Sequence, residues 1–178
     1  MADSILDAWA TRQYFESMDF AGRSPVLRLA PAAGTQPPRR YIAEFHCDGL
    51  VHAPSGIEVV NRHIVGINFP AHYLRTPTRP GEVVTWIAPA TEWHPNVNAP
   101  FACPGPIPPG MSLLNLLHQI FQMITWQRFT PREDDALNPA ACRWARQNME
   151  RFPVDPRRSM AAPASVSADV TTSGAGSQ

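Results

Sequence analysis

The stretch EVVTWIAPATEWHPNVNAPFACPGPIPPGMSLLNLLHQIFQMITW, residues 82–126, joins two regular patterns through a proline-rich segment. Its opening residues 82–88 are rich in β-branched and aromatic side chains and predict a strand. At the other end, Ser112 is a good cap for a helix whose apolar residues recur at three and four positions. Residues 89–111 have no periodicity, so they form either an ordered loop or a disordered linker. Their dense prolines favour order, because proline reduces the freedom lost on folding.

The rest of the chain adds elements on both sides of this stretch. The expected elements are a helix at 3–18 that Asp3 or Ser4 can cap, strands at 24–30, 40–52, 63–69 and 82–88, a helix at 113–126, and a helix at 138–152 that is capped by Asn138. Consecutive strands joined by short turns predict a four-stranded antiparallel meander. The sequence therefore predicts an α+β fold in one domain, residues 1–156. Residues 157–178 are small, polar and featureless, which predicts a disordered tail.

Composition and charge narrow the class of protein. Acidic and basic residues balance at fifteen each, which gives no field that would indicate binding to nucleic acid or to an anionic membrane. No apolar run could span a bilayer, and the acidic N-terminus lacks the pattern of a secretory signal, so a reducing, cytoplasmic location is expected. Cys47, Cys103 and Cys142 are odd in number and widely spaced, which argues against a disulfide framework. Without a Cys-x-x-Cys pair, no metal site is expected.

The chain contains no lysine, and all fifteen basic residues are arginine. A GC-rich genome would deplete lysine and would also explain the many alanine, proline and arginine residues. Alternatively, a free ε-amine would be harmful to the function of the protein. Arginine keeps the positive charge, but its guanidinium is a very poor nucleophile.

Five motifs follow one another along the chain. They are NFPAHYLRTPTRP (68–80), His94-Pro95-Asn96 continued by Val97, Cys103, LLNLLHQIFQMI (113–124) and EDDALNPAACRWARQN (133–148). In their order the motifs resemble the ubiquitin-conjugating enzymes, the E2 family, and Cys103 lies at nearly the family's spacing. The resemblance covers about residues 3–152 and implies a UBC-like fold: an N-terminal helix, the meander, an active-site loop and two C-terminal helices. Cys103 lies about one residue closer to His94 than in the family, and the residues after it, PGPIPPG (104–110), replace the usual hydrophobic ones. These departures suggest a bacterial-type relative.

The resemblance implies a chemical role for a small set of residues. Cys103 would carry the C-terminal acyl group of a ubiquitin-like modifier as a thioester, because sulfur forms acyl bonds and leaves readily. Asn96 would donate a hydrogen bond to the oxyanion formed when an amine attacks, although Asn96 could instead only tie down its own loop. Pro95 and His94 would order that loop.

An acidic residue is expected beside the thiol to orient the attacking amine. By its place in the motif Asp135 resembles the family's acidic residue, and Asp134 is the neighbour that could substitute for it. The competing explanation is that both aspartates cap a turn before the last helix. The implied partners are an E1-like adenylating enzyme, a ubiquitin-like modifier and a target amine. No cofactor or metal is implied.

Two other functions are compatible with the residues. One is a non-catalytic E2-like module that only binds a modifier. The other is a cysteine hydrolase that pairs Cys103 with a histidine, although such enzymes usually place the cysteine at a helix N-terminus. The acyl-carrier function would explain the absence of lysine, because a lysine-free carrier forms no isopeptide bonds with its own side chains.

Overall fold

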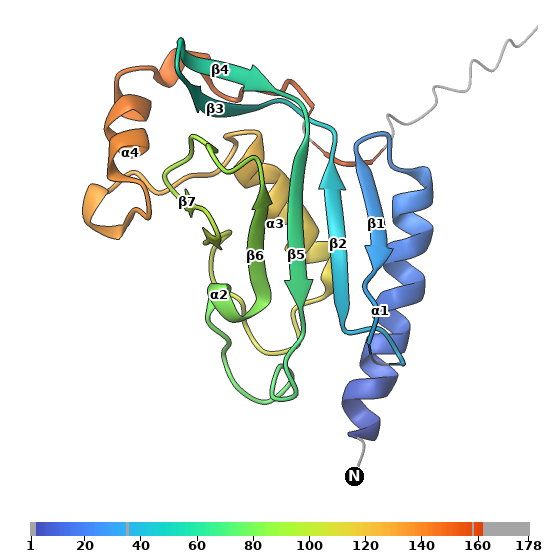
Figure 1. Cartoon of the computed structure of the whole chain (residues 1–178). Helices are drawn as coiled ribbons and strands as arrows, with labels where there is room; N and C mark the ends of the chain where they lie inside the picture. The colour runs from blue at the N-terminus through green and yellow to red at the C-terminus, as the bar shows by residue number, and fades with distance from the viewer. Residues whose placement is uncertain (1–2, 35, 158, 162–178) are drawn as a thin grey trace, which may run out of the picture.

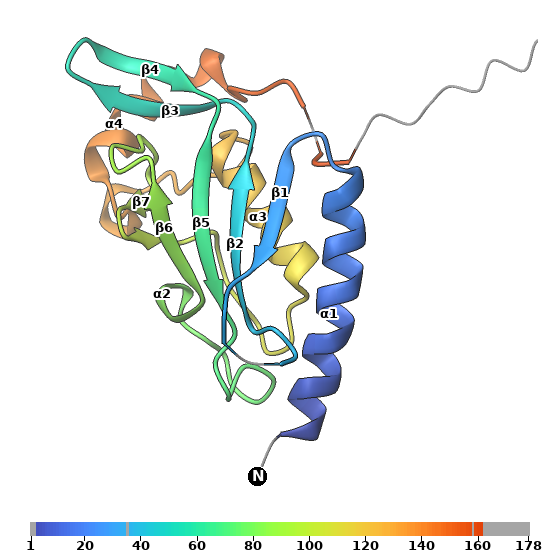
Figure 2. The ribbon, with the colours of Figure 1, turned by 45° about the vertical axis from the view of Figure 1, so that its right-hand side comes forward.

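A computed structural model describes residues 3–34, 36–157 and 159–161. It is an α+β structure, in which an antiparallel sheet is covered on one face by α3 (Leu113–Ile124) and flanked at the edge of its first strand by α1 (Ser4–Arg23). Figures 1 and 2 show that the opposite face of the sheet is not covered by a helix. The α+β class predicted from the sequence is confirmed. Among the described residues, none of the helices has both the length and the apolar content needed to cross a membrane.

The main helices begin where the sequence places their caps. The side chains of Asp3, Ser112 and Asn138 accept hydrogen bonds from the free backbone N–H groups of α1, α3 and α4 (Pro139–Arg146), respectively. The first helix continues to Arg23, beyond the predicted end at residue 18. The shorter helical turns are α2 (Pro80–Val83), η1 (Glu133–Asp135) and η2 (Met149–Arg151).

The main sheet has six strands in the order β1-β2-β5-β6-β8-β7. Its strands are β1 (Leu27–Pro31), β2 (Arg40–Phe45), β5 (His63–Asn68), β6 (Val84–Ala88), β8 (Phe101–Ala102) and β7 (Val97–Asn98). The first four are the predicted meander, and each pairs antiparallel with its neighbour. The short strands β7 and β8 extend the sheet from within the proline-rich segment, which is therefore an ordered part of the structure.

The prediction of a single strand over residues 40–52 is wrong. The chain leaves β2 after Phe45 and forms a separate hairpin of β3 (Gly49–Ala53) and β4 (Gly56–Val60) before it returns as β5. The break occurs where the backbone N–H of Asp48 binds the buried carboxylate of Asp155 (2.8 Å), a contact made far along the chain. The alternation from Tyr41 to Cys47 is still correct, because these inward side chains are buried.

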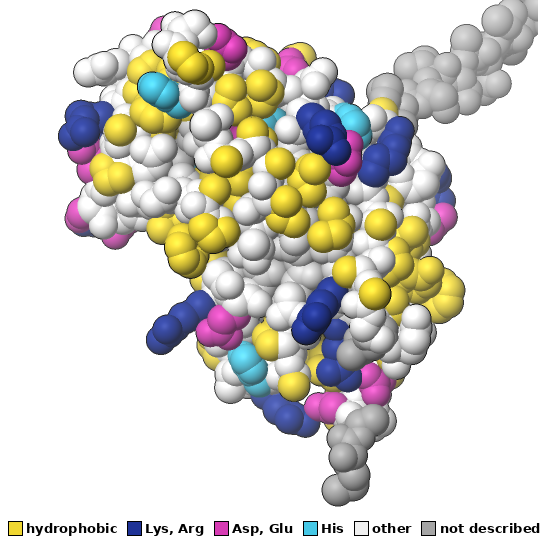
Figure 3. Space-filling view, in the orientation of Figure 1, with side chains coloured by type: hydrophobic (Ala, Val, Ile, Leu, Met, Phe, Trp, Pro, Cys, Tyr) yellow, Lys and Arg dark blue, Asp and Glu magenta, His cyan; other side chains and the backbone are white. Residues whose placement is uncertain are grey.

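The main core lies between α3 and the covered face of the sheet. The helix buries seven side chains, among them Leu116, Leu117 and Ile120, against strand residues such as Phe45 and Trp86. Full burial of one such side chain contributes about 1.5–3 kcal/mol, so this face of α3 holds the helix on the sheet. The open face instead exposes Ile42, Ile87 and Phe101. In Figure 3, hydrophobic side chains gather over the middle of this face.

A second, aromatic cluster holds the C-terminal segment beside the end of α3. Trp126 is buried and stacks on Phe152 with ring centroids 4.5 Å apart and an angle of 4° between the planes. Leu50 of the β3–β4 hairpin and Ala145 of α4 are buried in the same cluster. Arg157 pairs with Asp155, and Met160 is buried in the main core, so packed residues occur beyond the expected domain end at 156. The remainder of the expected tail, 162–178, lies outside the described residues.

Candidate active site

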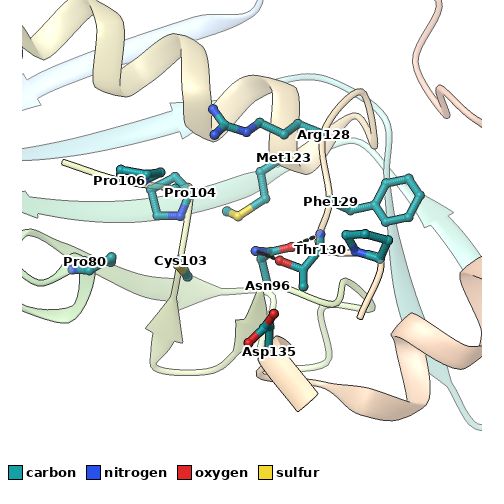
Figure 4. A pocket seen from close by; sticks show the side chains of 12 residues that line it. Pro80, Asn96, Cys103, Pro104, Pro106, Met123, Arg128, Phe129, Thr130 and Asp135 are labelled. Carbon is teal, nitrogen blue, oxygen red and sulfur yellow. Dashed lines mark hydrogen bonds between the residues drawn. The ribbon is translucent and has the colours of Figure 1, made fainter. Parts of the chain in front are cut away.

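A cleft of about 490 Å³ lies at the end of the sheet formed by β7 and β8. It is lined by residues of the β7–β8 hairpin and the loop after it, the end of α3 and the segment that follows, the start of α2, and η1. The lining residues are Pro80, Asn96, Cys103, Pro104, Gly105, Pro106, Met123, Arg128, Phe129, Thr130, Pro131 and Asp135. Figure 4 shows these side chains around the cleft.

The β7–β8 hairpin brings Asn96 and Cys103 side by side. Val97 pairs with Ala102 and Asn98 with Phe101, and the next position outward joins the N–H of Cys103 to the carbonyl of Asn96 (2.9 Å). Both side chains are half-buried and line the same cleft. Asn96 and Cys103 are therefore separated in the sequence by the residues of one tight hairpin. The β8 strand of this hairpin pairs with β6 of the main sheet.

Cys103 is the one accessible thiol of this chain. Cys47 lies in the main core, and burial raises the pKa of its thiol. Cys142 is buried in α4, where its Sγ donates to the carbonyl of Thr130 (3.4 Å). A thiol must reach solvent as a thiolate to act as a nucleophile, so the structure favours Cys103 for any chemistry at sulfur.

The amide of Asn96 forms a two-point contact with Thr130. Its Nδ2 donates to Thr130 Oγ1 (2.8 Å), and its Oδ1 accepts from the backbone N–H of Thr130 (2.8 Å). The side chain therefore ties the hairpin to the segment after α3, and not to its own loop. A primary amide carries two N–H donors, so one donor remains that is not used by Thr130. Thr130 was missed by sequence reasoning, because its contact with Asn96 spans 34 positions of the chain.

His94 and Pro95 hold the base of the hairpin. His94 is fully buried, its Nδ1 accepts from the N–H of Asn96 (3.0 Å), and its ring meets Trp126 edge-on at 4.6 Å. Burial lowers the pKa of His94 to about 3, although a backbone hydrogen bond at Arg128 opposes this shift. The imidazole is therefore neutral near pH 7 and acts as a fixed acceptor. The carbonyl of Pro95 accepts from the N–H of Asn138 (3.0 Å), which links the hairpin to the start of α4.

The two candidate aspartates differ in where they lie. Asp135 lines the cleft with a side chain that is 61% exposed, and its nearest cation is Arg132 at 3.4 Å. Asp134 is not among the lining residues and is held by Arg132, whose hydrogen bond lowers the pKa of that carboxyl. Both aspartates lie in η1, the turn before α4; the N-cap residue of η1 is Arg132, which makes no side-chain cap hydrogen bond, and α4 itself is capped by Asn138. The structure thus brings Asp135, and not Asp134, to the cleft that contains Cys103 and Asn96.

Arg128 reaches the cleft through the turn that ends α3. Trp126 has a positive φ of 59°, and the N–H of Arg128 then returns to the carbonyl of Gln122 (3.1 Å). A left-handed residue just after a helix reverses the chain and satisfies its last carbonyls. The guanidinium of Arg128 lies against Gly105, which also has a positive φ, 127°. The Pro-Gly-Pro sequence around Gly105 indicates a turn at Gly105, but nothing in it indicates that Arg128 lies beside that turn.

The cleft lining contains no histidine among the residues that the structure describes. A Cys103–histidine hydrolase therefore lacks its base in this arrangement. Among the same residues, no cluster of three or more His, Cys, Asp or Glu side chains could hold a metal ion.

No family model matches the chain, and no curated protein matches it.

Proposed function

We propose that the protein is a conjugating enzyme of the E2 type with a divergent UBC-like fold. It accepts a ubiquitin-like modifier from an E1-like enzyme as a thioester on Cys103 and passes it to an amine. The observation that carries the proposal is the meeting of an accessible thiol, a neutral amide and a carboxylate at one cleft, from Cys103, Asn96 and Asp135. The resemblance of the motifs at 68–80, 94–96 and 133–148 to the E2 family also supports the proposal.

The first step is transfer of the acyl group between two sulfur atoms. The Cys103 thiolate attacks the thioester carbonyl on the E1-like enzyme, the resulting oxyanion collapses, and the E1 thiolate leaves and takes up a proton. No redox change occurs and no energy source beyond the existing thioester is required. The position of Cys103 after a short hairpin at the sheet edge leaves its thiol open on the cleft side.

The second step forms the amide bond. The amine attacks the carbonyl carbon held on Cys103, the C–S bond breaks, and the proton lost by the amine returns to the sulfur through solvent or Asp135. The free N–H of Asn96 would donate to the oxyanion, an interaction whose loss typically slows a reaction by about 10²–10³-fold. The exposed carboxylate of Asp135 would hold the incoming ammonium beside the thioester until it loses its proton.

The test is to mix the protein with the cognate E1-like enzyme, the modifier and ATP, and to separate the products with and without reductant. A band that reductant removes is expected for the wild type. Cys103→Ser should give a band that resists reductant, because the oxyester is stable to thiols, whereas Cys142→Ser should keep the sensitive band. Without any adduct on Cys103 the proposed enzyme activity fails.

A non-catalytic modifier-binding module is the second candidate. The contact of both polar atoms of the Asn96 amide with Thr130 favours it, since a purely structural asparagine would make the same contacts. In that case Cys103→Ser would bind the modifier as well as the wild type does, and neither protein would form an adduct with it.

A further inference from the structure

The guanidinium of Arg128 lies at the edge of the cleft, next to Gly105 in the loop that follows Cys103. A Cβ atom on Gly105 would lie 2.9 Å from Nη2, 3.2 Å from Cζ and 3.4 Å from Nη1 of Arg128. The planar group therefore occupies the space beside Gly105, two residues after the thiol, and it would have to move if that position carried a side chain. Because Gly105 also has a φ of 127°, other residues are disfavoured there on backbone grounds as well.

The charge of Arg128 is not compensated by the described part of the protein. Nine of the described arginines form an ion pair with a carboxylate, namely Arg12, Arg23, Arg39, Arg62, Arg75, Arg132, Arg143, Arg146 and Arg157. Arg128 lines the cleft without such a pair among the described residues. Its forked donors match the two oxygens of a carboxylate.

The cleft thus carries opposite charges at two places around the thiol. In Figure 4, Arg128 lies on the side of Pro104 and Pro106, and Asp135 lies on the other side of Cys103 and Asn96. An incoming ammonium is attracted by Asp135 and repelled by Arg128. The peptide that carries the reacting carbonyl would then lie on the Arg128 side of the cleft, where a negative side chain of that peptide would form an ion pair with Arg128.

We propose that Arg128 is a specificity-determining residue that favours acyl donors with a side-chain carboxylate within a few residues of the reacting carbonyl. This inference rests on the proposed function and adds the chemistry of the donor: the tail of the modifier carries an aspartate or glutamate near its C-terminus. An exposed ion pair contributes at most about 1 kcal/mol, so the expected preference is about threefold to fivefold in the rate constant for acyl transfer to Cys103.

The test uses short synthetic peptide thioesters that end in glycine on a neutral thiol. In each peptide one residue before the glycine is aspartate, asparagine or arginine, and its position is varied. Each peptide transfers its acyl group to Cys103 and releases the small thiol, and the rate is followed by intact mass. The wild type should accept the aspartate peptide about threefold to fivefold faster than its asparagine match at one position or more, and the arginine peptide most slowly. About 1 M salt should remove the preference.

Variants separate the role of Arg128 from a general effect of charge. Arg128→Gln should lose the preference, whereas Arg40→Gln, at an exposed position on β2 away from the cleft, should behave as the wild type. Equal rates for all peptides on the wild type, or a preference that persists in Arg128→Gln, would overturn the inference while leaving Cys103 as an acyl acceptor. If no peptide acylates Cys103, the inference falls together with the proposed function.

Discussion

Replacing Asn96 by aspartate separates the structural contact of this side chain from its proposed role at the oxyanion. In Asn96→Asp, one carboxylate oxygen still accepts from the N–H of Thr130, as Oδ1 does now at 2.8 Å. The other oxygen accepts from the hydroxyl of Thr130, which can rotate to become the donor. The contact with Thr130 is kept, but the donor to the oxyanion is lost and a negative charge takes its place.

Loss of the Thr130 contact would change the free energy of unfolding, whereas loss of the oxyanion donor would change the transfer rate. Asn96→Ala leaves the N–H of Thr130 without its partner, which costs about 1–3 kcal/mol in the free energy of unfolding. Asn96→Asp should stay within about 1 kcal/mol of the wild type because neither polar atom of Thr130 loses its partner. Its transfer rate should fall by about 10²-fold or more, the cost of losing one oxyanion donor.

The assay loads Cys103 with a glycyl peptide from a synthetic thioester and measures a single turnover with a small primary amine by intact mass. Urea unfolding of the same samples gives the free energy of unfolding. Thr130→Val is the matched control, since it removes the Oγ1 acceptor but keeps the backbone N–H that binds Asn96. A transfer rate for Asn96→Asp within about threefold of the wild type would refute the oxyanion role, since losing such a donor costs about 10²–10³-fold, and would leave only the structural contact.

Three further predictions follow from the same structure. Arg128→Lys places an amine beside Gly105 in the cleft. With the complete partner system this variant should form a self-conjugate that mass spectrometry detects and that the wild type lacks. If the variant transfers the modifier but stays unmodified, the functional explanation of the missing lysines is contradicted. His94 has a folded pKa of about 3 against about 6.5 when unfolded. The unfolded chain therefore binds more protons, and the stability should fall as the pH drops from about 6.5 to 3, by up to about 1.4 kcal/mol per pH unit. His94→Gln should make the urea-unfolding stability less steep over that range, and an unchanged slope would exclude His94 as its source. Gly49→Ala puts a Cβ 2.5 Å from Cε1 of the buried His63 and should cost about 1–3 kcal/mol in urea unfolding, whereas Gly81→Ala, with nothing within 4 Å, should cost much less.

The predictions that succeeded depend on short-range rules. The caps at Ser112 and Asn138 are correct because a capping side chain bonds to an N–H three residues away. The alternation from Tyr41 to Cys47 is correct because one strand face is buried. The strand predicted across 40–52 was wrong because the chain leaves the sheet after Phe45, near a contact that no local pattern shows: the N–H of Asp48 binds the carboxylate of Asp155 across 107 positions of the chain.

The candidate site likewise has features that depend on neighbouring residues and features that depend on contacts between distant segments. The sequence alone determined the helix starts, the four strands of the meander, and a His-Pro-Asn motif near a cysteine, since each is a pattern of neighbouring residues. Only the tertiary structure decided that Asp135 and not Asp134 lines the cleft, that Asn96 binds Thr130, and that Arg128 lies on Gly105. Those contacts join the hairpin and the loop after it to the segment that follows α3, and their geometry depends on how α3 and the sheet pack.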